Sequence, residues 1–421
     1  MNWWLLRIAL ALALVFGLAG LSANAQEAEP EGSLEVFTWW TTGGEAAGLK
    51  ELFNLYEERF PAVGIIHTAV AGGAGEAAKA VLVTRMLGGN PPDSFQVHMG
   101  GELIETWVVT DFMEPLDELY RQEGWEEVFP QGVLDLLSYE GSYYSVPSNI
   151  HRSNVLWYNR PIFEQYGLEP PATFEEFFEI AELLEAEGII PHALGDTGIW
   201  ASTHLLETVL MGVLGPEAYR GLWTGATDWR SPEVTEALET FSRMLDYVNP
   251  DHSARSWDLA NNLLIEGRAA MYIHGDWVNA DYMAKDFEDY GFAPAPGNVG
   301  LYGALSDTFG LPRDAQNPTA TIEWLRLVGS KVGQEAFNPL KGSICARIDC
   351  DPEPFNPYLR WTMEQWEQDE IVPSLAHGAA APEAWVTDIH DVVSVFVSDR
   401  DVARAQEGLA RTCVDAGVCE Q

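Results

Sequence analysis

The chain has 421 residues and a formal net charge of −41 at pH 7, with 64 acidic and 23 basic side chains. Nothing in this balance offsets repulsion from phosphate groups, so nucleic acids and anionic membrane surfaces are excluded as partners. Only five lysines occur, and such an acidic shell is typical of proteins adapted to high salt, where screening suppresses self-repulsion.

The first 25 residues have the pattern of an export signal. A short start containing Arg7 precedes an apolar run over residues 8–21, which is too short to span a bilayer, and the sequence Ala-Asn-Ala ends at Ala25. We expect cleavage after Ala25 and release into the periplasm. No cysteine lies near this point, so we expect no lipid anchor. The remaining chain is too long for one core and predicts two lobes in a monomer.

Strand and helix patterns alternate along the chain. Strands are expected over residues 34–39, 65–71 and 94–98, with helices over 45–60 and 76–87 between them. This rhythm predicts an α/β fold with a doubly wound sheet.

A second α/β region is expected after residue 144. Thr173 and Glu176 form a capping box, which predicts a helix that starts there and ends at Gly188. Another helix is expected to begin at Ser231, with Pro232 in its first position.

Two adjacent tryptophans, Trp39 and Trp40, end the first predicted strand. Neighbouring strand residues point to opposite faces, so one indole can enter the core while the other stands at the carboxyl end of the strand. Open α/β sheets bind ligands at that end, and an indole plane suits the C–H face of a sugar ring. The alternative, that both side chains belong to the core, stays open at this stage.

Residues 73–78 match the pattern G-x-G-x-x-A of dinucleotide-binding turns. Glu76 stands where the pyrophosphate would lie, so we expect only a tight turn between strand and helix. No motif for a hydrolase, a zinc enzyme or a P-loop occurs, and no two histidines have metal-ligand spacing. We therefore expect no cofactor and no metal.

Gln96 and His98 lie two positions apart at the end of the third predicted strand, so both side chains point to one face. This pair indicates either a binding site or an ordinary edge strand.

All four cysteines lie near the C-terminus, and an even count in an exported protein predicts disulfides. Three pairings exist, of which the short spacings favour Cys345–Cys350 and Cys413–Cys419. A zinc site is the alternative, but the spacings fit no common zinc motif and no histidine is interleaved.

Several spaced segments occur in a characteristic order, at residues 141–147, 155–159, 167–177, 188–191 and 267–277. In this order they resemble the extracellular solute-binding proteins of ATP-driven (ABC) sugar importers, in the family that includes the maltose-binding proteins. The similarity covers about residues 33–404. It implies a binding protein rather than an enzyme, with ABC permease subunits in the inner membrane as its partners.

The resemblance implies a periplasmic binding protein fold of type II-like topology, with two α/β lobes and a ligand cleft between them. Lobe 1 is expected over residues 26–147 plus 305–345, and lobe 2 over residues 148–304 plus 346–421. The crossings are expected near residues 147–150, 300–307 and 343–349. Ligand binding is expected to close the hinge.

Within the family, the chain is most similar to the glucose/galactose-binding branch. This similarity implies that the ligand is a monosaccharide, namely glucose, or alternatively galactose or mannose. The resemblance places the binding residues at Trp40, Glu45, Gln96, His98, Trp257, Trp277, Asp307, Lys341 and His377. Trp39, Asn149 and His151 are added as neighbouring candidates. Such residues combine hydrogen-bond donors and acceptors for hydroxyls with indole rings for stacking.

Two alternatives are kept beside this interpretation. An exported carbohydrate-cleaving enzyme would also present tryptophans and carboxylates in a groove, although no catalytic pair can be selected here. A protein of the same fold could instead bind a disaccharide or a polyol.

Overall fold

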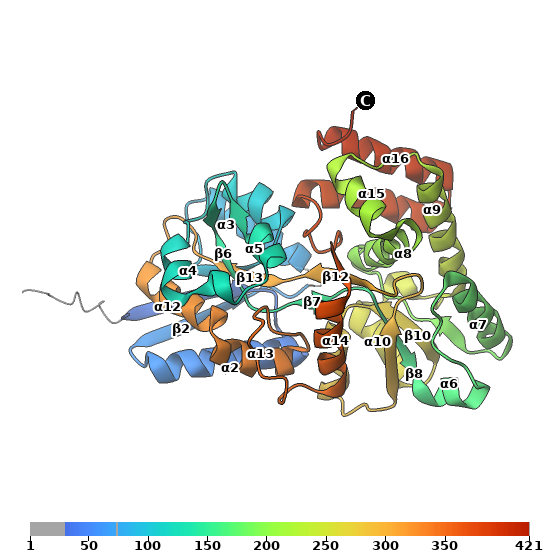
Figure 1. Ribbon diagram of the computed structural model, residues 1–421, viewed down its shortest axis with the longest axis horizontal. Helices are drawn as coiled ribbons and strands as arrows, with labels where there is room; N and C mark the ends of the chain where they lie inside the picture. Colours follow the sequence, from blue (N-terminus) through green and yellow to red (C-terminus); the bar gives the residue numbers. More distant parts are fainter. Residues whose placement is uncertain (1–29, 73–74, 421) are drawn as a thin grey trace, which may run out of the picture.

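The structure is a computed structural model that describes residues 30–72 and 75–420. The predicted export signal, residues 1–25, lies outside the described residues, and so does Gly73 of the glycine-rich turn. The described chain forms two bodies side by side (Figure 1). Within those residues, no helix combines the length and the apolar character needed to cross a membrane.

The first lobe is built on a five-stranded sheet with the order β2-β1-β3-β13-β6. Strands β1 (Gly32–Thr38), β2 (Val63–Ala69) and β3 (Ser94–His98) run parallel. Strands β13 (Asp307–Gly310) and β6 (Ser145–Pro147) return from later in the chain, and β13 is antiparallel to both β3 and β6. The three predicted strands are confirmed, although β1 and β2 end one and two residues earlier than expected.

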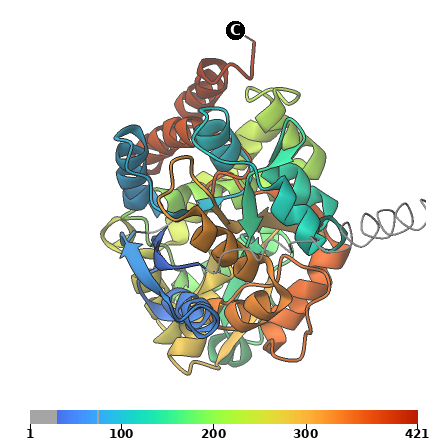
Figure 2. The same ribbon diagram turned by 90° about the vertical axis from the view of Figure 1, so that its left-hand side faces the viewer.

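Helices pack around this sheet, with α2 (Gly43–Arg59) at the near side in Figure 2. Helix α2 buries the stripe Leu49, Leu52 and Tyr56, which follows helical spacing. The hydroxyl of Tyr56 donates to the carbonyl of Ala320 at 2.9 Å and so ties α2 to α12. The other elements of this lobe are α3 (Glu76–Leu87), η2 (Glu102–Val108), α4 (Asp117–Glu123), η3 (Trp125–Glu127), α5 (Gln131–Leu137), β4 (Ser138–Tyr139), β5 (Ser142–Tyr143), α12 (Pro318–Gly329) and α13 (Lys331–Lys341).

The second lobe is built on a four-stranded sheet with the order β11-β8-β10-β9. Strand β8 (Val155–Asn159) is antiparallel to β10 (Ala269–His274) and β11 (Tyr290–Pro294), whereas β9 (Ile190–His192) is parallel to β10. Its other elements are α6 (Arg160–Tyr166), α7 (Phe174–Ala186), α8 (Trp200–Thr224), α9 (Pro232–Met244), η4 (Leu245–Tyr247), η5 (His252–Ala254), α10 (Trp257–Ile265), α11 (Trp277–Ala284), α15 (Glu383–Asp399) and α16 (Val402–Asp415).

The predicted helix starts in this lobe are confirmed. Thr173 caps α7, its side chain accepting from the backbone N–H of Glu176, and Glu176 accepts in return from the backbone N–H of Thr173. The side chain of Ser231 caps α9 by accepting from the backbone N–H of Val234, and Pro232 fills the first helical position, where no N–H is needed.

The chain passes between the lobes through a small middle sheet of β14 (Glu370–Pro373), β12 (Leu301–Leu305) and β7 (His151–Arg152). Strand β6 leads into β7, and β12 leads into β13, so each passage takes only a few residues. A third passage follows α13, where residues 150 and 344 form a β-bridge. These passages support the predicted lobe boundaries, which remain a prediction.

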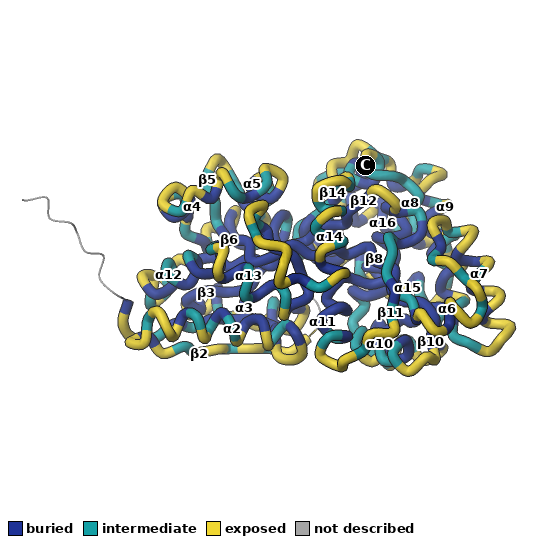
Figure 3. Tube along the Cα trace, turned by 60° about the horizontal axis from the view of Figure 1, so that its bottom comes forward, coloured by how far each residue is buried: buried dark blue, intermediate teal, exposed yellow. Residues whose placement is uncertain are grey.

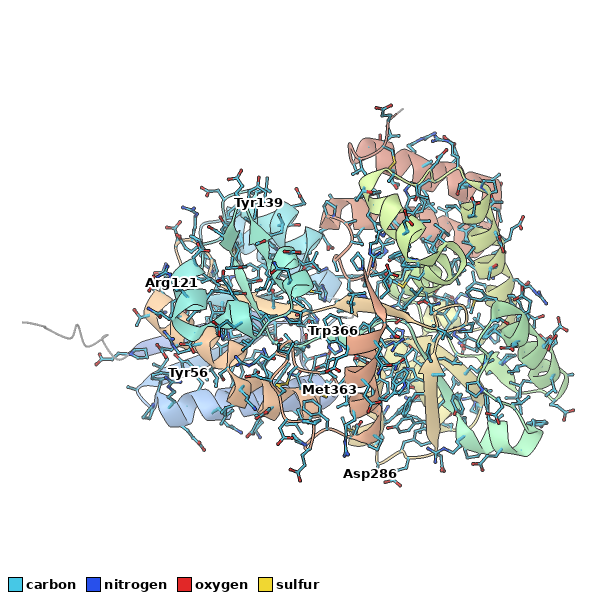
Figure 4. The ribbon with its side chains drawn as sticks, in the orientation of Figure 1. Tyr56, Arg121, Tyr139, Asp286, Met363 and Trp366 are labelled. Atoms are coloured by element: carbon cyan, nitrogen blue, oxygen red, sulfur yellow. A yellow bond between two sulfur atoms is a disulfide. The ribbon has the colours of Figure 1, made fainter. Side chains whose placement is uncertain are left out.

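Helix α14 (Pro357–Gln368) stands beside this junction (Figures 1 and 4). Trp366, labelled in Figure 4, packs edge-on against Tyr302 of β12, with ring centroids 5.0 Å apart. Buried residues fill the central strands of both lobes, and exposed residues gather in the outer loops and helix faces (Figure 3).

Both predicted disulfides are present, Cys345–Cys350 and Cys413–Cys419. The first lies in the passage that follows α13, four residues beyond Lys341, and so ties down the loop beside that lysine. The second joins the last turn of α16 to the segment that follows it.

Candidate ligand-binding site

A cavity of about 660 Å³ lies between the two lobes. The structure brings nine of the twelve predicted site residues to its wall, which are Trp39, Glu45, His98, His151, Trp257, Trp277, Asp307, Lys341 and His377. The other three, Trp40, Gln96 and Asn149, lie behind the wall and are fully buried. The predicted cleft between the lobes is therefore a partly open cavity that both lobes line.

The ends of strands and the starts of helices explain why these side chains meet. In the first lobe, β3 ends at His98, and Asp307 opens the antiparallel β13 directly opposite it. In the second lobe, three tryptophans are the first residues of their helices: Trp200 of α8, Trp257 of α10 and Trp277 of α11. The positive end of the helix dipole accompanies each of these starts.

The prediction that Trp40 lines the site is wrong. Its side chain is fully buried between Phe309 and Phe337, with ring centroids 5.8 and 5.3 Å away. Strand β1 ends at Thr38, so the two-residue alternation of a strand no longer sets the direction of the two indoles. Trp40 instead supports the site from behind, because the Nζ atom of Lys341 lies 5.3 Å from its ring centroid.

Trp39 takes the position at the wall that Trp40 was expected to hold. Its ring packs against the glycine-rich turn so closely that a Cβ atom on Gly75 would lie 2.7 Å from it. Gly75 also has a φ of 77°, which favours glycine. The turn therefore serves to seat an aromatic ring, and the centroid of that ring is 5.1 Å from the imidazole of His98.

Asp307 is the central anion of the site. Its Oδ1 accepts from Nε2 of Gln96 at 2.7 Å, and its Oδ2 accepts from Nδ2 of Asn149 at 2.9 Å. Burial raises the pKa of Asp307, but the charge of Lys341, together with the other polar groups around the carboxylate, outweighs this effect and holds that pKa far below its usual range. Asp307 is therefore ionised, and Gln96 and Asn149 orient it from behind the wall.

Lys341 is the central cation, and three groups hold its ammonium. Its Nζ donates to Nε2 of His151 at 2.9 Å and to Oε1 of Glu45 at 3.2 Å, and it lies 3.9 Å from Oδ2 of Asp307. Because an ammonium can only donate, Nε2 of His151 accepts, and its Nδ1–H donates to the buried carboxylate of Asp276. This chain of contacts links the second lobe to the first.

His98 belongs to a second network that also joins the lobes. Its Nδ1 lies 2.7 Å from Oε2 of Glu102, which forms an ion pair with Lys79 at 2.8 Å. Lys79 in turn contacts Glu383 of α15, in the second lobe, at 2.8 Å. Burial raises the pKa of Glu102, but the charges of Lys79 and His98 outweigh this effect and lower it. The contact between Lys79 and Glu383, which joins the lobes, is therefore linked through Glu102 to His98 in the cavity wall.

Small residues let the lobes approach at the edge of the cavity. A Cβ atom on Gly44 would lie 2.5 Å from Cβ of Ala280, and one on Gly342 would lie 2.9 Å from the same atom. Ala280 belongs to α11 of the second lobe, and both glycines belong to the first. The two lobes are therefore in close contact at this edge of the cavity.

Sequence reasoning missed Trp200, which lines the cavity 6.2 Å from Trp277, measured between ring centroids. Trp39 follows β1 directly, whereas seven residues separate Trp200 from the end of β9, so Trp200 carries only a weaker form of the same signal. The outer wall also includes Asp258, Asp281 and Lys285, for which the sequence offers no comparable signal.

Two α/β lobes, joined by short passages and closed around a cavity with an ion pair and indole rings in its wall, define a ligand-binding protein of the two-lobe type. Residues 40–335 match the family described as "bacterial extracellular solute-binding protein", and the chain belongs to this family. It is accordingly a binding protein and not an enzyme.

Individual relatives agree with this assignment. An uncharacterized ABC transporter extracellular-binding protein of Pyrococcus horikoshii is 37% identical over 379 residues, which cover 88% of this chain and 85% of the relative. A probable sugar-binding periplasmic protein of Mesorhizobium japonicum is 31% identical over 93% of this chain and 94% of its own. A solved solute receptor with an exclusive preference for β-D-galactopyranose has the same fold, with a TM-score of 0.82 at 18% identity, covering 91% of this chain and 99% of its own.

Proposed function

We propose that this protein captures a monosaccharide in the cleft between its lobes and delivers it to the membrane permease of an ABC importer. Glucose is the proposed ligand, with galactose and mannose as the next candidates. The name of the Mesorhizobium japonicum relative supports a sugar as the ligand, and the name of the Pyrococcus horikoshii relative supports an ABC transporter as the partner. A glucose-binding protein of Saccharolobus solfataricus, 26% identical over 72% of this chain and 59% of its own, gives more distant support for glucose.

The observation that carries the proposal is the chemistry of the cavity wall. Indole rings of Trp39, Trp200 and Trp277 offer flat apolar faces for the C–H face of a pyranose. Asp307 and Lys341 stand among them as a charged acceptor and a charged donor for hydroxyl groups. A small polar ligand with one apolar face satisfies both features at once.

The size of the cavity agrees with a small ligand. Sites for small molecules usually enclose about 300 to 1,000 Å³, and this one encloses about 660 Å³. One hexose with a few bridging waters fits such a space. Binding in the micromolar range needs only about −8 kcal/mol, which a few charge-assisted hydrogen bonds and ring stacking supply after ordering costs.

The proposed mechanism is hinge closure. The ligand contacts groups from both lobes, so it binds the closed arrangement better than the open one and shifts the population toward closure. We propose that the closed monomer then docks on the permease. Export through the predicted signal, with cleavage after Ala25, would place it in the periplasm.

Titration calorimetry tests the ligand. The purified chain without the signal is titrated with glucose, galactose, mannose, xylose, maltose and sorbitol. We expect one glucose per chain at micromolar affinity and weaker binding of maltose and sorbitol. Binding of maltose or sorbitol without any response to the hexoses would contradict the proposal.

A wedge at the contact between the lobes tests the closure mechanism. Ala280→Phe places a large ring where Gly44 and Gly342 leave no room, so the lobes cannot close fully. We expect glucose affinity to fall at least about tenfold, or about 1.4 kcal/mol, by calorimetry. The melting temperature without ligand should change little. Ala186→Phe, on the exposed face of α7, is the matched control and should bind like the wild type.

A further inference from the structure

A buried carboxylate holds the turn that carries His377. Glu207 lies within α8 and is fully buried, and its Oε2 accepts the backbone N–H groups of Leu375 and Ala376 at 2.6 and 2.8 Å. Its Oε1 accepts the hydroxyl of Ser374 at 2.9 Å. Glu207 therefore holds three successive residues, 374–376, of the turn between β14 and α15 by hydrogen bonds to its two carboxylate oxygens.

Ser374 connects this carboxylate to the imidazole of His377. Its Oγ lies 2.9 Å from Nδ1 of His377. A hydroxyl has one proton to donate, and the charged acceptor, Glu207, forms the stronger hydrogen bond. Oγ then accepts from His377, so Nδ1 carries the imidazole proton. Nε2 is left as the acceptor on a ring that lines the cavity.

We propose that Glu207 sets the tautomer of His377 through Ser374, and so decides whether this imidazole accepts a hydrogen bond from a sugar hydroxyl or donates one. The identity of the hydroxyl ligand rests on the proposed function, whereas the relay itself does not. Glu207 and Ser374 are positioning residues, because neither of them lines the cavity.

The reverse state follows from the same geometry. When Glu207 is protonated, or replaced by glutamine, the group that faces Ser374 becomes a donor. Ser374 then accepts from position 207 and donates its own proton to Nδ1 of His377. The imidazole proton must move to Nε2, and the ring presents a donor to the cavity instead of an acceptor.

Several ionisable groups surround the relay. His204, with Nδ1 3.9 Å from Oε1, and Tyr219 face Glu207 from the same helix, and Ser153 faces it from the segment after β7. His377 is faced by His98 from β3, His204 from α8, His274 from β10 and Lys79 from α3.

Glu207 titrates in a range where the imidazoles of His204, His274 and His377 do not. Burial raises the pKa of Glu207 to about 7. The backbone N–H groups and the hydroxyl that donate to this carboxylate lower its pKa, but burial outweighs them. Burial lowers the pKa of His204 to about 4, and it lowers the pKa values of His274 and His377 well below 6.5. A change at His377 near neutral pH therefore does not come from titration of His377 itself, and its loss in Glu207→Gln assigns it to Glu207.

Nitrogen NMR of the ligand-free chain, labelled with ¹⁵N-histidine, tests the relay. Subtracting the spectrum of His377→Gln assigns the ring nitrogens. At about pH 9 the wild type should have its proton on Nδ1, and Glu207→Gln should have it on Nε2. Glu217→Gln, an exposed carboxylate on the same helix, is the matched control and should match the wild type.

Lowering the pH through about 7 should move the wild-type proton to Nε2, while Glu207→Gln stays unchanged. The same tautomer in the wild type and in Glu207→Gln would overturn the proposal. If Glu207→Gln does not fold, the wild-type titration decides alone, and a tautomer that is constant between about pH 9 and pH 5.5 would overturn it.

Sugar titration separates the relay from the proposed ligand. Glucose affinity of Glu207→Gln at about pH 9 should fall about tenfold relative to the wild type and to Glu217→Gln. If no sugar binds to any variant but the tautomer still switches, the relay stands and the proposed ligand is wrong. If sugar binds equally well to all variants and no switch occurs, the relay is wrong and the proposed ligand stands.

Discussion

Asp307→Asn should weaken glucose binding at least about 100-fold, or roughly 2.7 kcal/mol. Asp307 is the buried anion beside Lys341, and it is oriented for ligand by Gln96 and Asn149. A hydrogen bond to a charged group contributes about 1.5 to 3 kcal/mol, and loss of the anion also leaves the ammonium of Lys341 with Glu45 as its remaining carboxylate partner. Titration calorimetry measures the change in affinity.

The control for this experiment is Asp135→Asn, an exposed carboxylate on α5 of the same lobe. It should bind glucose like the wild type. Thermal unfolding of both variants verifies that the lobes remain folded, since an asparagine at position 307 still accepts from neighbouring amides. Affinity of Asp307→Asn within threefold of the wild type would remove Asp307 from the site.

Trp40→Ala should lower the free energy of unfolding by about 3 to 5 kcal/mol, the cost of emptying a large core position. Its indole is fully buried between aromatic rings of β13 and α13, at the joint between sheet and helix. Urea denaturation followed by circular dichroism gives this free energy. Sugar binding of the folded fraction should weaken as well, because Lys341 loses the ring beneath its ammonium.

Two neighbouring substitutions make the result specific. Trp40→Phe should recover most of the lost stability, because the buried Nε1 of Trp40 has no hydrogen-bond partner among the described residues. Trp39→Ala should lower the unfolding free energy less than Trp40→Ala does, because its ring faces the cavity on one side, and should weaken glucose binding about tenfold. Equal losses of stability in Trp39→Ala and Trp40→Ala would contradict the division of roles between the two indoles.

Features that depend on short stretches of chain were predictable. The strands of the first lobe follow from alternating polarity, the start of α7 follows from Thr173 and Glu176, and the two disulfides follow from short spacings. Family resemblance placed Asp307, Lys341 and His377 at one site although they lie far apart in the sequence, and the structure brings all three to one cavity.

Features that depend on where a side chain points beyond the end of an element were not predictable. Trp39 and Trp40 exchange their expected roles because β1 stops at Thr38, and the turn at Gly75 and the ring of Phe337 then decide which indole faces the cavity.

The sequence by itself determined the alternating strands and helices of an α/β fold, since periodicity and caps are local properties. Its ordered motifs also determined the family, and the family resemblance implied two lobes and most of the polar groups that line the cavity. The tertiary structure alone decided that Trp200 joins the wall and that Glu207 holds His377 through Ser374. Glu207 and Ser374 lie 167 residues apart in the sequence, and only the packing of α8 against the middle sheet brings them within hydrogen-bond distance.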